Sequence, residues 1–274
     1  MKISFLGGGN MAAALIGGML ERGFDATELQ VVELDAGNRE RLQSRFGVRA
    51  TDVADAQALA CDVLVLAVKP QQMKAALTPL AGKLHATLVI SIAAGLRVAD
   101  IGRWLGGNNG AYKRIVRCMP NTPALIGAGI TGLYADSSVD AAGREAAQRI
   151  LAAVGSTVWI ANEAQLDGVT GVSGSGPAYV FHFIEALEAA GRAQGFDAAT
   201  ARKLAIDTVL GAAKLAASSE DSPSVLREKV TSKGGTTAAA LAHLAAGGWH
   251  DMLVGAVSAA AARGRELGDE LGKD

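Results

Sequence analysis

The first part of the chain, up to Asn162, alternates short apolar runs with longer stretches of helical character. Strands that are buried on both faces form such continuous apolar runs, and their alternation with helices is typical of βα units around a parallel sheet. The pattern therefore predicts a doubly wound α/β domain over residues 1–162. Its expected strands are residues 2–6, 29–34, 61–68, 87–93, 114–119 and 156–161.

After Asn162 alanine, leucine and glutamate dominate, the β-branched runs disappear, and glycine stands mainly between helical stretches. Residues 177–195 and 199–219 have apolar residues at helical spacing and glycine or serine near their ends. We expect an all-α domain over residues 163–274. Its broad apolar faces favour a core that is completed by a second copy of the chain.

The first predicted strand runs into a glycine-rich turn. Gly7, Gly9 and Ala12 fit the pattern G-x-G-x-x-G/A, and Asn10 and Met11 open the helix that follows. The first glycine permits a tight turn, the second lets the backbone approach a pyrophosphate, and the small third residue allows close helix packing. A strand before and a helix after the turn predict a Rossmann-type domain that binds a dinucleotide.

The residues after the second strand leave the type of dinucleotide open. Glu33, about 20 residues past the glycines, is placed to hydrogen-bond a ribose 2′-hydroxyl, which favours NAD. Asn38, Arg39 and Arg41 follow and could instead meet a 2′-phosphate, although at least one arginine is expected to lie in solvent on the first turn of a helix.

Three further loops follow apolar strands, namely residues 67–73, 91–95 and 118–129. Open α/β sheets bind ligands at the carboxyl ends of their strands, so these loops are expected to wall the cofactor. The candidate cofactor contacts on them are Ala67, Val68, Lys69, Pro70, Ala93, Ala94 and Asn121.

Composition and charge narrow the classes of partner. The formal net charge is -1, without the basic patch that nucleic acid or an anionic membrane surface requires. Cys61 and Cys118 lack the spacing of a metal or redox pair, and the histidines and carboxylates form no ligand cluster, so we expect no metal. No signal peptide or membrane span is evident, which favours a cytoplasmic protein with a small-molecule substrate.

Six segments, in this order and spacing, closely resemble pyrroline-5-carboxylate reductases: FLGGGNMAAAL, AVKPQQM, SIAAG, MPNTPALIGAG, GVSGSGPAYVF and VTSKGGTTAAAL. The resemblance implies an N-terminal Rossmann domain and a helical dimerisation domain. It also implies hydride transfer from NADPH, with NADH as a usable second cofactor, to the C5 atom of 1-pyrroline-5-carboxylate, which gives L-proline. A homodimer that assembles into a larger ring such as a decamer is implied as well.

The resemblance also assigns the substrate site. Gly234 and Gly235 precede a helix expected to begin at Thr236, whose free N–H groups suit a carboxylate. Thr237 is the implied catalytic residue beside the ring nitrogen, whereas Lys233, a proline in many relatives, either attracts the carboxylate or lies in solvent. The implied substrate contacts are Ser173, Gly174, Ser175, Ser232, Gly234, Gly235, Thr236 and Thr237.

Two alternatives stay open. Hydroxyacid dehydrogenases resemble the glycine pattern of Gly171, Gly174 and Gly176, but they follow it with a catalytic lysine where this chain has Val180. Oxidation of an alcohol requires a general base, which valine cannot provide, whereas an imine nitrogen is itself basic. The second alternative is a regulator that binds NADPH without turnover, because a fold does not determine a function.

Overall fold

The computed structural model describes residues 1–107 and 110–273, which fall into two compact units. Unit 1 comprises Met1–Ser175 and Ser258–Asp274, and unit 2 comprises Gly176–Val257. Residues 163–175 thus pack with the first unit, beyond the predicted boundary at residue 162, which stays a prediction.

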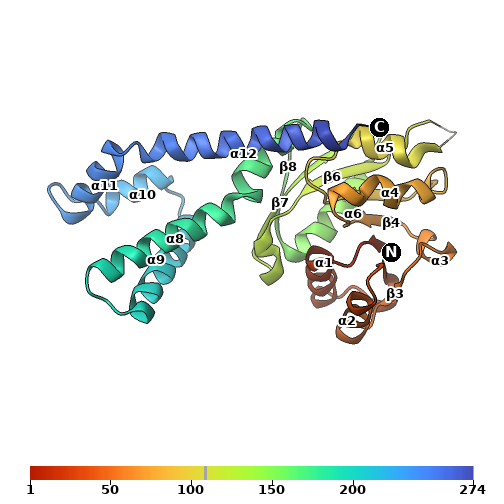
Figure 1. The fold of residues 1–274 in the computed structure, drawn as a ribbon, viewed down its shortest axis with the longest axis horizontal. Helices are drawn as coiled ribbons and strands as arrows, with labels where there is room; N and C mark the ends of the chain where they lie inside the picture. The colour runs from red at the N-terminus through yellow and green to blue at the C-terminus, as the bar shows by residue number, and fades with distance from the viewer. Residues whose placement is uncertain (108–109, 274) are drawn as a thin grey trace. The chain divides into compact units, whose positions relative to one another are not determined.

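An eight-stranded sheet lies at the centre of unit 1, in the order β3-β2-β1-β4-β5-β6-β7-β8 (Figure 1). β1, β2, β4 and β5 are buried along their whole length, as their unbroken apolar runs predict. The chain order reverses at β1, where open α/β sheets bind their ligands. The strands are β1 (Ile3–Leu6), β2 (Leu29–Val32), β3 (Arg49–Thr51), β4 (Val63–Leu66), β5 (Leu88–Ser91), β6 (Ile115–Met119), β7 (Gly129–Ala135) and β8 (Gly155–Trp159).

The sheet is parallel from β3 to β6, as predicted, but β7 pairs antiparallel with β6. β8 pairs parallel with β7, so these two strands run opposite to the others. The connection from β6 to β7 holds only the short helix η5 (Thr122–Ile126). A parallel pair would need a crossover of a dozen or more residues, so this short connection returns the chain in the opposite direction. The sequence prediction missed β7, whose glycines weaken its strand pattern, and the three-residue β3.

Helices cover both faces of the sheet. Val63 and Val65 belong to one apolar cluster, whereas Leu64 and Leu66 belong to another, because successive side chains of a strand point to opposite faces. The doubly wound arrangement is therefore confirmed. The helices of unit 1 are α1 (Asn10–Glu21), α2 (Ala36–Phe46), α3 (Ala56–Leu59), α4 (Met73–Leu77), α5 (Val98–Gly106), α6 (Ala141–Leu151) and α7 (Gln165–Val169), followed by the π-helical turn η7 (Thr170–Gly174).

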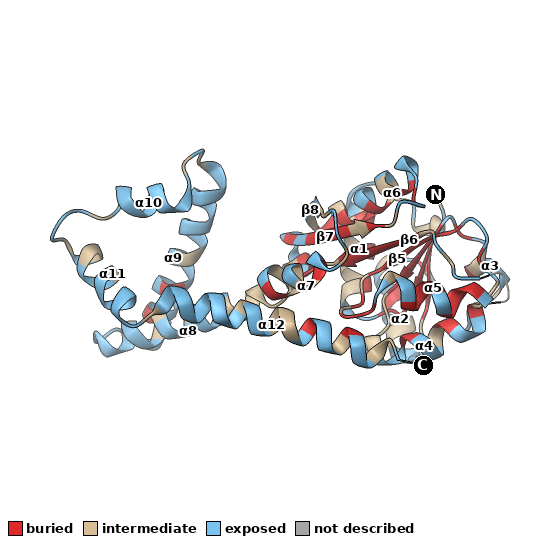
Figure 2. Ribbon diagram, turned by 90° about the horizontal axis from the view of Figure 1, so that it is seen from above, coloured by how far each residue is buried: buried red, intermediate tan, exposed pale blue. Residues whose placement is uncertain are grey.

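Unit 2 is helical throughout, as predicted, and most of its residues are exposed (Figure 2). Its helices are α8 (Gly176–Ala193), α9 (Ala198–Ser218), α10 (Pro223–Lys229), α11 (Thr236–Ala246) and α12 (Trp249–Leu271), the last of which continues into unit 1 from Ser258. The buried residues of unit 2 are Ala201 and Ala205. Large apolar side chains such as Phe181, Leu210 and Met252 are exposed. Unit 2 alone therefore leaves much of its apolar surface uncovered.

Candidate functional site

Two glycines of the first turn are required for different reasons. Gly7 has a φ of 100°, and a Cβ atom there would lie 2.8 Å from the backbone of Ala67. The fold itself therefore excludes a side chain at this position. A Cβ atom on Gly9 would meet nothing within 4 Å. Gly9 thus leaves open space above the turn, as the approach of a pyrophosphate to the backbone requires.

Helix α1 begins directly after this turn. Gly9 is its N-cap residue and offers no side chain to the first N–H groups of the helix. In contrast, α2 and α6 begin after Asp35 and Asp140, whose carboxylates accept N–H groups of their first turns. The N-terminus of α1, with Asn10 and Met11, therefore keeps N–H donors and positive potential available to an anion.

The other predicted cofactor contacts of unit 1 follow neighbouring strands. Ala67 to Pro70 follow β4, and Ala93 and Ala94 follow β5, while β1 and β4 and then β4 and β5 are paired in parallel. Lys69 is exposed, whereas Ala93 is buried. The structure therefore brings these loops and the glycine turn to the carboxyl edge of the sheet, as expected.

Glu33 contacts the glycine turn directly. Its Oε2 atom accepts the N–H of Gly8 at 2.8 Å, and its Oε1 atom accepts the N–H of Asp35 at 2.9 Å. Arg39 donates to the carbonyl oxygens of Glu33 and Leu34 at 2.8 and 2.7 Å. Both side chains thus lie at the carboxyl end of β2, where the adenosine ribose of a dinucleotide is bound in Rossmann folds.

Unit 2 holds the second group of predicted residues at the start of α11. Gly234 has a φ of 69°, and Gly235 is the N-cap residue, without a side chain to cap the helix. A Cβ atom on Gly235 would lie 2.5 Å from the Oγ atom of Ser232. Thr236 and Thr237 are the first two helical residues, as predicted. The N-terminus of α11 therefore also keeps backbone donors for an anion.

Comparison with known proteins identifies the family. The chain is 44% identical to pyrroline-5-carboxylate reductase of Pseudomonas aeruginosa, over 99% of this chain and 98% of that protein. The family model for pyrroline-5-carboxylate reductase dimerisation matches residues 163–267, and that for NADP oxidoreductase, coenzyme F420-dependent, matches residues 2–95. The chain belongs to the pyrroline-5-carboxylate reductase family.

Solved structures of the pyrroline-5-carboxylate reductase family have the same fold. The reductase of Coxiella burnetii is 40% identical, with a TM-score of 0.90 over 97% of this chain and 98% of that one. The enzyme of Plasmodium falciparum, solved with NADP bound, is 29% identical, with a TM-score of 0.85 over 98% of both chains. The Rossmann-type fold followed by a helical region is therefore confirmed.

Sequence reasoning missed one contact between predicted residues of this reductase fold. It placed Asn121 with the cofactor and Ser173 with the substrate, but the Asn121 side chain donates to the Ser173 carbonyl at 3.1 Å. The two residues could have been placed together only by recognising that the chain returns directly from β6 to an antiparallel β7. The end of β6 and the turn η7 thus form one cluster in unit 1.

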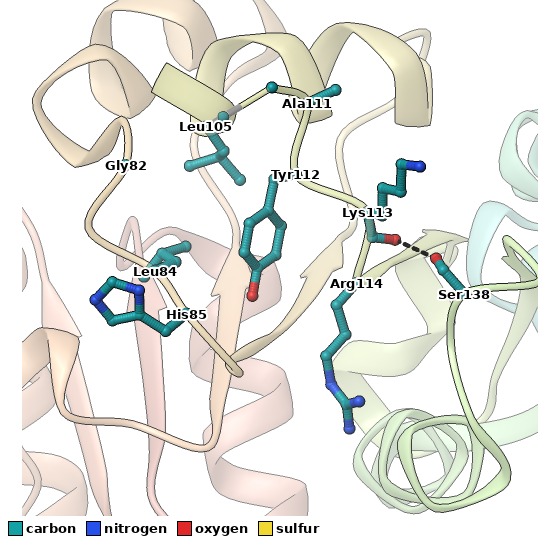
Figure 3. Close-up of a pocket in the computed structure, with 11 residues that line it drawn as sticks. Gly82, Leu84, His85, Leu105, Ala111, Tyr112, Lys113, Arg114 and Ser138 are labelled. Atoms are coloured by element: carbon teal, nitrogen blue, oxygen red, sulfur yellow. Dashed lines mark hydrogen bonds between the residues drawn. The ribbon is translucent and has the colours of Figure 1, made fainter. Parts of the chain in front are cut away.

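A cavity of about 400 Å³ lies elsewhere in unit 1. His85 precedes β5, and Lys113 and Arg114 precede β6, so the cavity lies at the amino ends of these strands. Figure 3 shows Tyr112 among these side chains and the Ser138 hydroxyl, which donates to the Lys113 carbonyl at 2.8 Å. None of the predicted site residues lines this cavity. It is separate from the edge that carries the glycine turn.

The described cysteines and metal-ligating side chains form no reactive site. Cys61 and Cys118 are buried free thiols, and burial raises the pKa of each, so both are protonated at neutral pH. Within residues 1–107 and 110–273, no three His, Cys, Asp or Glu side chains are grouped as metal ligands. No described helix is long and apolar enough to cross a membrane.

Proposed function

We propose that this chain reduces 1-pyrroline-5-carboxylate to L-proline, the last step of proline biosynthesis, with a hydride from NADPH. The observation that carries the proposal is the 44% identity to a pyrroline-5-carboxylate reductase over nearly the full length of both chains. Two helices that begin at uncapped glycines, α1 and α11, support it, because the reaction requires one site for a pyrophosphate and one for a carboxylate.

NADPH supplies the hydride, and NADH is proposed as a second usable cofactor. The open space above Gly9 fits the pyrophosphate, and the residues proposed to hold the cofactor lie along the carboxyl edge of the sheet. Glu33, in contact with Gly8, would repel a 2′-phosphate unless Arg39 or Arg41 offsets it, so the two cofactors must be compared directly. The proposed contacts are Gly7, Gly9, Asn10, Met11, Glu33, Ala67, Val68, Lys69, Pro70, Ala93 and Ala94. The side chain of Asn121, the remaining candidate from the sequence, is instead bonded to Ser173 and Ile130.

The substrate carboxylate is proposed to bind at the N-terminus of α11, on Ser232, Gly234, Gly235 and the backbone of Thr236. The Thr237 hydroxyl orients the ring nitrogen through a hydrogen bond as the imine becomes an amine. Hydride adds to C5, and the nitrogen keeps the proton of the iminium form, so no strong protein acid is needed. Ser173, Gly174 and Ser175 complete the proposed substrate contacts.

Val180 argues against a hydroxyacid dehydrogenase. It lies on α8, and its side chain cannot take a proton from an alcohol. A regulator without turnover is disfavoured because it would have no use for a carboxylate site on α11. We expect no oxidation of 3-hydroxyisobutyrate with either NADP or NAD.

The assembly is proposed to be a homodimer through unit 2, since the dimerisation family model covers residues 163–267 and the apolar side chains of unit 2 are exposed. We further propose that the dimers assemble into a larger ring such as a decamer. A cytoplasmic location is proposed with it, because proline biosynthesis uses the NADPH pool of the cell.

The proposal is tested by the oxidation of NADPH and of NADH at 340 nm with 1-pyrroline-5-carboxylate. Thr237→Ala is expected to lower kcat/KM about 100-fold while the affinity for NADPH is unchanged, because the lost hydroxyl acts on the imine alone. Thr231→Ala is the matched control, since the Thr231 hydroxyl donates to the Arg227 carbonyl within unit 2. NADPH binding without turnover by the wild type would contradict the proposal.

A further inference from the structure

A proline leaves one backbone carbonyl of the η7 turn without its usual partner. In an α-helix the carbonyl of residue i accepts the N–H of residue i+4, which for Ser173 is Pro177. Proline has no N–H. The turn before it is already widened, since the Ser175 N–H donates to the Thr170 carbonyl at 2.8 Å. The Ser173 carbonyl therefore needs a donor from outside the i+4 ladder.

Asn121 supplies that donor. Its Nδ2 atom donates to the Ser173 carbonyl at 3.1 Å, and its Oδ1 atom accepts the Ile130 N–H at 2.9 Å. The two partners fix the orientation of the carboxamide, because a carbonyl can only accept and a backbone N–H can only donate. Asn121 is buried, with 8% of its surface exposed. One side chain thus joins the end of β6, the start of β7 and the turn.

A further contact places the turn on β6. A Cβ atom on Gly174 would lie 2.5 Å from the Cε atom of Met119, so the glycine backbone packs directly on the last residue of β6. The Ser173 hydroxyl donates to the Val169 carbonyl at 3.0 Å, within its own helix. The Asn121 amide thus binds the backbone carbonyl of Ser173, while the hydroxyl of the same residue donates within the helix.

We propose that Asn121 is a positioning residue for imine reduction, which holds the Ser173–Ser175 turn against the carboxyl end of β6. The inference rests on the proposed function, in which this turn contacts the imine. Asn121 then acts on the substrate through Ser173 and does not set the affinity for the cofactor. This role differs from the direct cofactor contact that its position in the sequence favours.

Asn121→Asp tests the inference with a side chain of nearly equal size. The carboxylate still accepts the Ile130 N–H but faces the Ser173 carbonyl with a second acceptor. We expect the KM for 1-pyrroline-5-carboxylate to rise about tenfold, as expected for loss of about one buried hydrogen bond, with the KM for NADPH within about twofold of the wild type. A variant that was only destabilised would lose active enzyme, and so kcat, without this change in KM.

Asn162→Asp is the matched control. Its side-chain oxygen accepts the Ala164 N–H at 3.0 Å on the exposed surface, which a carboxylate also accepts. Both KM values should match the wild type. Asn121→Ala, which removes the donor without adding charge, replaces the Asp variant if that one does not fold. A raised KM for NADPH, or an unchanged KM for the imine, would overturn the inference.

Hydrogen exchange separates this inference from the proposed function. In Asn121→Asp, a peptide spanning residues 170–181 is expected to exchange faster than in the wild type, because the turn loses its anchor. Unchanged exchange in this peptide would overturn the positioning role. This measurement needs no turnover, so a wild type inactive on 1-pyrroline-5-carboxylate would contradict the proposed function and leave the exchange result decisive for Asn121.

Discussion

Gly7 and Gly9 belong to the same glycine turn, yet the structure gives them different roles. The positive φ of Gly7 and its close approach to Ala67 serve the fold, whereas the open space at Gly9 serves an incoming ligand. Gly23 offers a third case, with a φ of 83° and open space around a Cβ atom. Alanine substitutions at the three positions therefore distinguish the effects of a left-handed backbone, of a steric clash and of a blocked ligand site.

Gly7→Ala is expected to lower the free energy of unfolding by more than about 2 kcal/mol, because a left-handed conformation costs roughly 1–2 kcal/mol and the clash adds to it. Gly9→Ala should leave the Tm unchanged and raise the Kd for NADPH about tenfold, since its methyl group occupies the space left for the pyrophosphate. Thermal unfolding and cofactor titration measure these effects.

Gly23→Ala is the control for strain alone, with a loss of about 1 kcal/mol and unchanged cofactor affinity. A Gly9→Ala variant that binds NADPH as tightly as the wild type would contradict the assignment of the pyrophosphate to this turn.

An ion-pair network links strand β6 to the residues before and within α7. Arg117 on this strand is buried, and it pairs with Glu163 at 3.1 Å and with Asp167 at 3.8 Å. Glu163 also accepts the Val98 N–H at 2.8 Å, at the start of α5. This buried network anchors the residues before and within α7, and hence the start of the η7 turn, to the sheet.

Arg117→Met is expected to lower the free energy of unfolding by about 3 kcal/mol, because it leaves two partly buried carboxylates without their cation. Denaturant unfolding measures the loss. Arg192→Met is the matched control: Arg192 pairs with Glu188 at 3.6 Å on an exposed helix face, where an ion pair contributes little. Equal losses in the two variants would contradict the anchoring role of Arg117.

The strands buried on both faces and the long helices could be predicted from sequence, because burial determines their apolar pattern. The strand β7 could not, since Gly132 interrupts its apolar pattern. A Cβ atom on Gly132 would lie 2.8 Å from the Val169 side chain, so the glycine makes room for that residue. The contact of Asn121 with Ser173 depends on the antiparallel return of the chain. It is therefore a property of topology, which local sequence does not express.

Unit 2 lacks a core of its own on the scale of unit 1, since most of its residues are exposed and Ala201 and Ala205 are its buried residues. Phe181 and Val53 are both 60% exposed in the single chain, the first in unit 2 and the second in unit 1. If unit 2 is the dimer interface, the same substitution should have different effects at the two positions.

If the proposed dimer forms through unit 2, Phe181→Glu is expected to convert it into monomers and to abolish most activity, because a charge would be buried in the interface. Val53→Glu should keep the wild-type mass and serves as the control. Light scattering after size exclusion measures both. A Phe181→Glu variant that retains the wild-type mass would place the interface elsewhere.

Reduction of 1-pyrroline-5-carboxylate by this chain is tested most directly by following the hydride itself. The enzyme is incubated with 1-pyrroline-5-carboxylate and NADPH that carries deuterium at both C4 positions, and the product is identified by mass spectrometry and NMR. The expected product is L-proline with a single deuterium, located on C5. Oxidation of NADPH without L-proline, or L-proline without deuterium at C5, would contradict hydride transfer to the imine carbon.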